Sequence, residues 1–474
     1  MKVRNPRTGE CDYEIAPLDE QAVADTAARL RKAQTGWTDL SVEDRGDILL
    51  RWVKAIEARI DDIAAALTVD TGRSGISRLE VLGIPGLIQR WASSAVDIIA
   101  EHSPSGAPTA QPTITTTTRL VPYPLVGVIS PWNFPLTLAL IDAIPALMAG
   151  CAVLVKPSEV TPRFIRPLAE TIAEVPEIAE VLVIIEGDGA TGAAMVEHVD
   201  YVCFTGSVAT GRKVGEAAAR AFIPASLELG GKDPMLVLAS ADPVKAAETA
   251  VRASIVNTGQ ACQSIERVYV AREIAEPFMA ALVEKAKAVR LNHPDIGSGD
   301  IGPFIFEKQA AIVQAHIDDA VAKGADVLAG GQVENLDGGL YLRPTVLSGV
   351  TPDMAIVTEE TFGPVIPVIV FDDVDQAVQL ANTSIYGLSA AVIAGTAAEA
   401  ESVAVRLNAG GVSINDGSLT SMIWEAEKSS FGLSGLGPSR MGESGLLRFF
   451  RRQALIRQEG EAAPITAYAE ENLR

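Results

Sequence analysis

Apolar positions recur every three or four residues through the first hundred residues of the chain. Between Leu18 and Ala100 they stand opposite charged positions, a spacing that predicts a series of amphipathic helices. Residues 104–112 end this pattern with Pro, Ser, Gly and Thr. The threonine-rich run from Thr113 to Val121 then predicts an exposed strand, which pairs with another subunit or lies across the surface.

From Val126 to about Leu238, short apolar runs alternate with helical patterns, which favours a parallel sheet with helices on both faces. A second alternating region extends from Ala247 to about Gly411. Because 474 residues exceed the roughly 250–300 residues that one hydrophobic core supports, we expect an α/β protein with at least two cores. The predicted strands are 126–129, 152–155, 181–185, 201–204, 235–238, 267–270, 346–347, 365–371, 388–393 and 453–457.

The longest apolar stretch extends from Leu136 to Val155, and Asp142, Pro145 and Gly150 interrupt it. A membrane span needs roughly 20 mostly uncharged apolar residues. This stretch therefore predicts a core helix that ends near Gly150, followed by a buried strand. No apolar segment follows the first six residues, so no secretory signal is expected.

The formal net charge of −21 argues against nucleic acid and anionic membrane surfaces as partners, because both select for clustered Lys and Arg. The four cysteines and four histidines are dispersed, without the spacing of a zinc site or a disulfide framework. We therefore expect no metal site. Isolated thiols in a chain of this length fit a reducing, cytoplasmic location.

Two residues suit covalent catalysis followed by hydrolysis. Cys262 lies among small and polar residues, and Glu228 precedes the pair Gly230 and Gly231. A thiolate can attack an electrophilic carbon, and a carboxylate can deprotonate the water that releases the product. Each residue also has a simpler interpretation, as a buried structural thiol and a solvated carboxylate. Cys203, inside an apolar strand, illustrates the first of these.

Four further segments have the composition of binding loops. Asn133, between Pro131 and Pro135, offers an amide to an oxyanion, although a buried turn explains it equally well. Gly206 and Ser207 follow a predicted strand and open a helix, where backbone N–H groups bind phosphate; a plain loop is the alternative. The GxGxxG fingerprint is absent.

The segment Lys156, Ser158 and Glu159 ends a predicted strand, at the edge where ligands bind in parallel sheets. Its carboxylate can accept the ribose hydroxyls of NAD, or the charges can simply cap the next helix. Glu360 and Phe362 precede another predicted strand, where an acidic turn is the alternative.

These segments, taken in chain order over residues 131–364, resemble the NAD(P)-dependent aldehyde dehydrogenase family of the hydrolytic, non-acylating type. The resemblance implies a Rossmann-type dinucleotide-binding domain (1–103 and 123–229) and a second α/β catalytic domain (230–447). It also implies a small β-flap for oligomerisation with a C-terminal tail (104–122 and 448–474). In that arrangement the chain is a homodimer or homotetramer.

The resemblance assigns catalytic roles to three residues. Cys262 attacks the aldehyde, Asn133 and the Cys262 backbone N–H bind the oxyanion, and Glu228 activates water. The cofactor implied is NAD, with NADP as the alternative, and the residues implied to bind it are Trp132, Lys156, Ser158, Glu159, Gly206, Ser207, Glu360 and Phe362. The substrate pocket implied consists of Phe134, Leu138, Ile141, Ala261 and Gln263.

One segment departs from the family pattern. Relatives carry Phe-Gly-Gly-x-Lys-x-Ser-Gly near the end, whereas residues 431–440 here lack the second glycine and the lysine. Relatives that oxidise succinic semialdehyde carry an arginine where this chain has Ile141, so we expect an uncharged aliphatic or aromatic aldehyde as substrate. The alternatives are a semialdehyde dehydrogenase, a CoA-acylating enzyme and a relative without catalytic activity.

Overall fold

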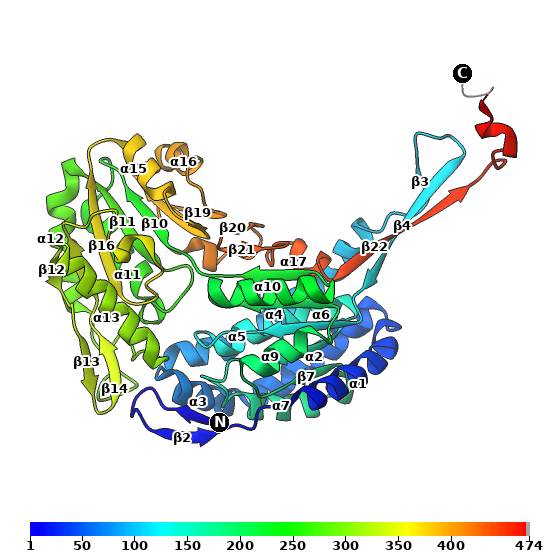
Figure 1. The fold of residues 1–474 in the computed structure, drawn as a ribbon, viewed down its shortest axis with the longest axis horizontal. Helices are drawn as coiled ribbons and strands as arrows, with labels where there is room; N and C mark the ends of the chain where they lie inside the picture. Colours follow the sequence, from blue (N-terminus) through cyan, green and yellow to red (C-terminus); the bar gives the residue numbers. More distant parts are fainter. Residues whose placement is uncertain (471–474) are drawn as a thin grey trace.

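The computed structural model describes residues 1–470, which form two main sheets and an extended β-arm (Figure 1). The first sheet has the strand order β21-β9-β8-β5-β6-β7, in which β21 is antiparallel to β9 and the other neighbours are parallel. Its strands are β5 (Leu125–Ile129), β6 (Ala152–Lys156), β7 (Leu182–Ile184), β8 (Tyr201–Thr205), β9 (Ala225–Glu228) and β21 (Gly435–Leu436).

Strands β5, β6 and β8 are buried along their whole length, as the continuous apolar runs predict. The sheet and the surrounding helices share one core, to which Leu446 and Phe449 return from the far end of the chain. The helices are α1 (Glu20–Thr38), α2 (Val42–Ala58), α3 (Ile60–Thr71), α4 (Gly75–Glu101), α5 (Pro135–Leu140), α6 (Ala143–Ala149), α7 (Ile165–Ala173), α8 (Pro176–Val181), α9 (Gly189–Val196), α10 (Val208–Ala221) and α17 (Ser444–Leu447).

The second sheet has the order β12-β15-β16-β11-β10-β18-β19. Met235 and Val237 of β10 belong to one apolar cluster and Leu236 to another, so both faces of this sheet are covered. Its elements are β10 (Asp233–Val237), α11 (Pro243–Ile255), β11 (Ile265–Ala271), α12 (Arg272–Ala288), α13 (Glu307–Ala322), β12 (Asp326–Ala329), β15 (Thr345–Ser348), α14 (Ala355–Thr358), β16 (Val365–Phe371), α15 (Val374–Asn382), β18 (Ser389–Ile393), α16 (Ala397–Ala404) and β19 (Gly411–Ile414).

Two details differ from the sequence-based expectations. The run 235–238 was grouped with the first region, but β10 pairs with β11 and β18 of the second sheet. The single helix expected before Gly150 is divided into α5 and α6, because the chain turns at Asp142, whose carboxylate lies buried between two arginines. Gly150 closes α6 at φ 99°, as predicted. Within residues 1–470 no helix is long and apolar enough to cross a membrane.

The arm consists of β4 (Ile114–Pro122), β22 (Phe450–Gln458) and the short β3 (Ala107–Pro108), and it projects from the body (Figure 1). The threonine-rich strand and the strand predicted at 453–457 are thus antiparallel neighbours within one chain. The remaining short elements are β1 (Lys2–Arg4), β2 (Cys11–Glu14), η1 (Val256–Gly259), β13 (Val333–Leu336), β14 (Gly339–Leu342), β17 (Tyr386–Gly387), η2 (Leu419–Ser421), β20 (Phe431–Gly432) and η3 (Ile465–Tyr468).

The domain boundaries proposed from the sequence stay a prediction. The one at 229/230 falls between β9 and β10, which lie in different sheets. The one at 447/448 places α17 in the catalytic domain, although Leu446 packs into the first core. Residues 471–474 of the predicted tail lie outside the described residues.

Candidate functional site

A cleft of about 790 Å³ opens at the carboxyl ends of the first sheet's strands. Ile129, Lys156, Thr205 and Glu228, which end β5, β6, β8 and β9, all line it. Cys262 lines the same cleft from the second half of the chain. A cleft at this edge of a parallel sheet is where such folds bind nucleotides, and its size suits a cofactor.

Most of the predicted site residues share this cleft. Those that line it are Trp132, Asn133, Leu138, Lys156, Ser158, Glu159, Gly206, Ser207, Glu228, Cys262, Glu360 and Phe362. The described lining does not include Phe134, Ile141, Ala261 or Gln263. Phe134 instead lies under the Arg73 guanidinium, 5.5 Å from the ring centroid, and the Gln263 side chain accepts a hydrogen bond from Thr420 (2.9 Å).

The loop that carries Cys262 has an unusual backbone. Asn257, Thr258 and Gly259 are consecutive left-handed residues, with φ values of 55°, 59° and 70°. A Cβ on Gly259 would lie 2.3 Å from the carbonyl carbon of Gly363, so only glycine fits there. Strain of this kind persists only where the surrounding structure holds it, and it is concentrated at functional sites.

Hydrogen bonds tie this loop to Asn133. The Asn133 amide donates to the backbone carbonyl of Gln260 (3.0 Å), and the Asn257 amide donates to the Asn133 carbonyl (2.9 Å). The buried Arg73 donates to that carbonyl (3.0 Å) and to the Asn257 side chain. One N–H of the Asn133 amide is thereby engaged, and within residues 1–470 the second has no partner. The loop thus holds Asn133 in place with one donor free.

The Cys262 thiol is protonated at rest. Burial raises the pKa of Cys262 to about 12, and the charges of Asp233, Glu360 and Glu228 act in the same direction. The ammonium of Lys428 opposes them and lowers it. A thiol in this state acts as a nucleophile at neutral pH only when its proton is removed.

Glu228 ends β9 and its carboxylate lies between two donors from the C-terminal part of the chain. Ser430 donates its hydroxyl to one carboxylate oxygen (3.3 Å), and Arg440 Nε lies 3.9 Å from the other. The Glu228 side chain is 21% exposed, so the cleft water can reach it. A half-buried carboxylate that lines the same cleft as a thiol is suited to general-base chemistry.

Glu360 turns towards the double glycine that follows Glu228. The Gly231 backbone N–H donates to its carboxylate (3.1 Å), and burial with the nearby Glu266 charge raises the pKa of Glu360 to about 8. Glu266 in turn accepts from the backbone N–H groups of Thr361 and Phe362 (both 2.8 Å). The Phe362 ring meets the Trp132 ring edge-on at 5.5 Å.

The other end of the cleft has the features of a phosphate and ribose site. Ser207 caps α10, so the positive end of the helix faces the cleft. A Cβ on Gly211 in this helix would lie 2.4 Å from the Leu229 side chain, which explains how closely α10 approaches β9. Lys156 lies 3.6 Å from the Glu159 carboxylate, and burial lowers the pKa of Lys156.

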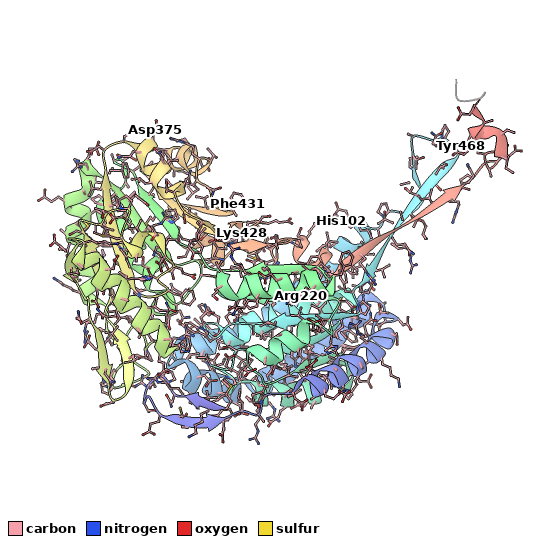
Figure 2. The ribbon with its side chains drawn as sticks, viewed as in Figure 1. His102, Arg220, Asp375, Lys428, Phe431 and Tyr468 are labelled. Atoms are coloured by element: carbon pink, nitrogen blue, oxygen red, sulfur yellow. The ribbon has the colours of Figure 1, made fainter. Side chains whose placement is uncertain are left out.

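Several residues around the site were not predicted from the sequence. Asn257 lies in the Cys262 loop itself, and the others come from distant segments without a motif of their own: Arg73, Thr420, Lys428, Ser430 and Arg440. The signal that the sequence offers is the altered segment at 431–440, which contains Arg440 and closely follows Lys428 and Ser430. Lys428 lies just before this segment, close to Phe431 at its start (Figure 2).

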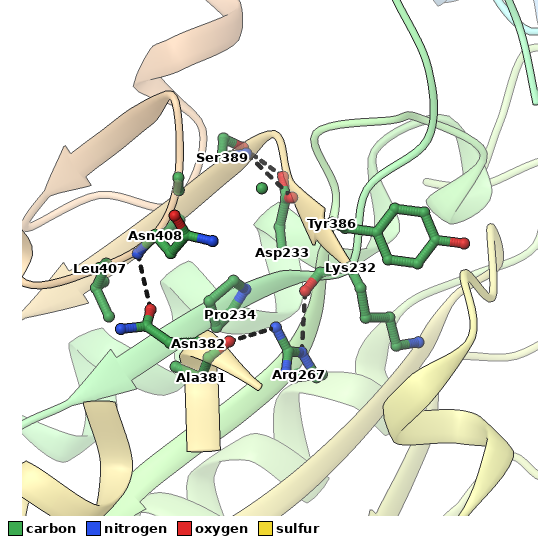
Figure 3. A pocket seen from close by; sticks show the side chains of 13 residues that line it. Lys232, Asp233, Pro234, Arg267, Ala381, Asn382, Tyr386, Ser389, Leu407 and Asn408 are labelled. Carbon is green, nitrogen blue, oxygen red and sulfur yellow. Dashed lines mark hydrogen bonds between the residues drawn. The ribbon is translucent and has the colours of Figure 1, made fainter. Parts of the chain in front are cut away.

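A second cavity, of about 10 Å³, lies near Arg267 and is too small for a substrate (Figure 3). Arg267 donates to the carbonyls of Lys232 (2.9 Å) and Ala381 (3.0 Å) across it. Asp233 accepts from the Ser389 hydroxyl beside it. These bonds connect β11 with α15 and with the residue before β10, and they connect β10 with β18, so the cavity belongs to the packing of the second sheet.

Comparison with known proteins gives one consistent result. The model of the aldehyde dehydrogenase family matches residues 1–455. A Mycolicibacterium smegmatis protein, provisionally named succinate-semialdehyde dehydrogenase [NADP(+)], is 37% identical over 91% of this chain and 84% of its own length. A provisionally named aldehyde dehydrogenase structure from Anabaena variabilis has a TM-score of 0.96 and 51% identity, covering 98% of this chain and 99% of its own. Betaine aldehyde dehydrogenase from Staphylococcus aureus in complex with NAD+ has a TM-score of 0.90 and 28% identity, covering 99% and 94%.

Proposed function

Because this chain belongs to the aldehyde dehydrogenase family, we propose that Cys262, Asn133 and Glu228 carry out its NAD(P)-dependent oxidation of an aldehyde to a carboxylic acid. The observation that carries this assignment is the single cleft lined by a thiol, an amide and a carboxylate. The three side chains come from separate segments of the chain, and each suits one step of the reaction.

The first step is attack by the Cys262 sulfur on the aldehyde carbon. Since the thiol is protonated at rest, its proton must leave to water in the cleft as the C–S bond forms, so that Glu228 stays ionised for the later hydrolysis. The aldehyde oxygen becomes an oxyanion. The free N–H of Asn133 and the Cys262 backbone N–H stabilise that charge, and one such donor contributes roughly 2.7–4 kcal/mol.

The cleft fits a dinucleotide. The capped start of α10 suits its diphosphate, Lys156 and Glu159 suit one ribose, and Glu360 near the thiol suits the other. Trp132, Ser158, Gly206, Ser207 and Phe362 complete the surface. NAD(P), when bound, accepts the hydride that leaves the substrate carbon. Glu159 opposes a 2′-phosphate by charge, which favours NAD over NADP.

Hydrolysis completes the cycle. Glu228 takes a proton from water, the water oxygen bonds to the thioester carbon, and the C–S bond breaks. The Cys262 sulfur leaves as a thiolate and is protonated again. A carboxylate positioned for this step favours hydrolysis over transfer to CoA.

The substrate proposed is an uncharged aliphatic or aromatic aldehyde, because Ile141 supplies no partner for a distal carboxylate. A specific observation favours a second candidate, a semialdehyde. Lys428 is a half-buried cation whose charge acts on Cys262, and within residues 1–470 it has neither an ion pair nor a hydrogen bond. Relatives provisionally named succinate-semialdehyde dehydrogenases point the same way.

We further propose that the β3–β4–β22 arm joins copies of the chain into a homodimer or homotetramer in the cytoplasm. Leu455 and Ile456 on β22 are 45% and 70% exposed, and such apolar side chains on a projecting strand need a partner surface.

The assignment is tested by NADH absorbance with a panel of aldehydes, including succinic semialdehyde, and with NAD or NADP. We expect Cys262→Ser to abolish NADH formation, since a serine hydroxyl is a far weaker nucleophile. The matched control is Cys203→Ala, which removes a buried thiol from β8 and should retain activity. Near-normal turnover by Cys262→Ser would refute the assignment.

A further inference from the structure

The altered segment at residues 431–440 brings Arg440 to the carboxylate of Glu228. β21 pairs with β9 so that Gly435 lies opposite Glu228, and Arg440 follows shortly after. Arg440 Nη2 donates to Asp142 (2.9 Å) and to the Thr205 hydroxyl (2.7 Å). Its Nε lies 3.9 Å from Glu228, too far for a hydrogen bond but within range of an ion pair.

The Nε atom of Arg440 indicates a specific role for this arginine. It is fully buried, and within residues 1–470 it has no hydrogen-bond partner. Buried donors are almost always satisfied, so an unsatisfied one facing a carboxylate calls for an explanation. A movement of the Glu228 side chain by about 1 Å would bring its oxygen within the roughly 2.7–2.9 Å of a charge-assisted hydrogen bond.

The charges around Arg440 point in the same direction. Asp142 pairs with both Arg440 (2.9 Å) and Arg448 (2.5 Å), and the Asp142 and Arg448 side chains are 1% and 0% exposed. The Asp142 carboxylate therefore pairs with two guanidinium groups in the protein interior. Glu228 is the further anion within ion-pair range of this group in the described chain, and it balances the excess positive charge.

We propose that Arg440 is a positioning residue that holds the Glu228 carboxylate in the orientation from which it deprotonates the hydrolytic water. Asp142 and Thr205 fix the guanidinium from one side, and its Nε restrains Glu228 from the other. Ser430 completes the restraint by donating to the second carboxylate oxygen. The inference rests on the proposed function, because it assigns a task to a residue within that mechanism.

The step concerned is the release of product. Water loses one proton to Glu228, its oxygen bonds to the thioester carbon, and the C–S bond breaks. The released Cys262 sulfur is protonated, which gives one carboxylic acid and the free thiol. Attack on the aldehyde and hydride loss come before this step. A misplaced Glu228 therefore slows turnover after the first NADH has formed, because the thiol proton leaves to water without its help.

The test is rapid mixing of Arg440→Lys with saturating NAD and aldehyde. Lysine keeps the positive charge beside Asp142, but its single nitrogen cannot serve Asp142 and Glu228 together. We expect a burst of about one NADH per active site, followed by a steady state about tenfold below the unmodified enzyme, within the range for a general base. Hydroxylamine, which attacks the thioester without a base, should restore the steady-state rate.

Two further variants make the result decisive. Glu228→Gln should give the same burst and a larger loss; without any burst in that variant the proposed function itself fails. Arg448→Lys disturbs the same buried aspartate without facing Glu228, so it should lower thermal stability while leaving the ratio of burst to steady-state rate unchanged. Arg440→Lys with an unchanged steady state, or with burst and steady state lowered together, would overturn the role of Arg440.

Discussion

At the scale of single residues, the site depends on groups whose charge state is set by burial. Cys262, Glu360 and Glu80 all lie in poorly hydrated places, and burial is the largest cause of each pKa shift. The sequence identified Cys262 and Glu360 by their motifs but carried no sign of Glu80. A carboxylate on a long helix resembles any solvated charge until the helix is packed.

The first prediction concerns the reactivity of Cys262. With its pKa raised to about 12, the thiolate is a small fraction that grows with pH, so alkylation by iodoacetamide should accelerate about tenfold per pH unit between pH 7 and 10. The measurement is mass spectrometry of the cofactor-free protein in a Cys11→Ser background, because Cys11 is exposed.

The matched variant is Lys428→Gln. Its ammonium lowers the Cys262 pKa, so its removal should slow alkylation at every pH in this range. A rate that does not change with pH would show that the thiolate already predominates at rest.

The second prediction concerns Glu80, which accepts a hydrogen bond from the Thr137 backbone (3.1 Å) beneath the Asn133 loop. Burial raises its pKa from 4.5 to about 7, so the folded protein binds a proton there that the unfolded chain has lost. The stabilisation is therefore complete below about pH 4.5 and is lost as pH rises through about 7.

Glu80→Gln is neutral at every pH. The unmodified protein loses stability over this range, so the difference in unfolding free energy, Glu80→Gln minus unmodified protein, should rise by up to about 3 kcal/mol between pH 4.5 and 8. Urea unfolding of both proteins measures it. An equal pH dependence in both proteins would contradict the shifted ionisation of Glu80.

At the scale of elements, the close approach of α10 to β9 brings the helix start and Glu228 into one cleft. Two glycines on α10 differ in what a side chain would meet. A Cβ on Gly211 would lie 2.4 Å from Leu229, whereas one on Gly215 would lie 3.4 Å from Leu227, an ordinary contact.

The third prediction compares Gly211→Ala with Gly215→Ala. The first should lower stability by about 1–3 kcal/mol and weaken NAD binding, because Leu229 or the helix must move. The second should be neutral or stabilising by about 0.5–1 kcal/mol, since alanine favours a helix. Urea unfolding and a titration with NAD check both. Similar effects at the two positions would argue against tight packing at Gly211.

At the scale of the whole molecule, the arm is the part that packing within one chain leaves uncovered. β22 is exposed along almost its whole length, and its long pairing with β4 leaves it projecting into solvent (Figure 1). A two-stranded ribbon alone is marginally stable, so a further surface is needed to cover it.

The fourth prediction is that Ile456→Glu, on the arm, yields monomers by light scattering after size exclusion. A charge at a 70% exposed apolar position disturbs an interface but not the folded chain. The control is Val405→Glu on the body, where the side chain is 83% exposed. Dissociation by the control, or an unchanged mass for Ile456→Glu, would place the subunit contact elsewhere.

The sequence by itself determined most strands and the α/β class, and it supplied the three side chains proposed to react, because apolar runs, glycines at turns and motif spacing are local properties. Tertiary structure decided which sheet receives β10, that β4 and β22 pair, and that Arg440 reaches Glu228. Each of these joins residues far apart in the chain. Their contact follows from burying apolar surface and balancing buried charge, and no local pattern records either one.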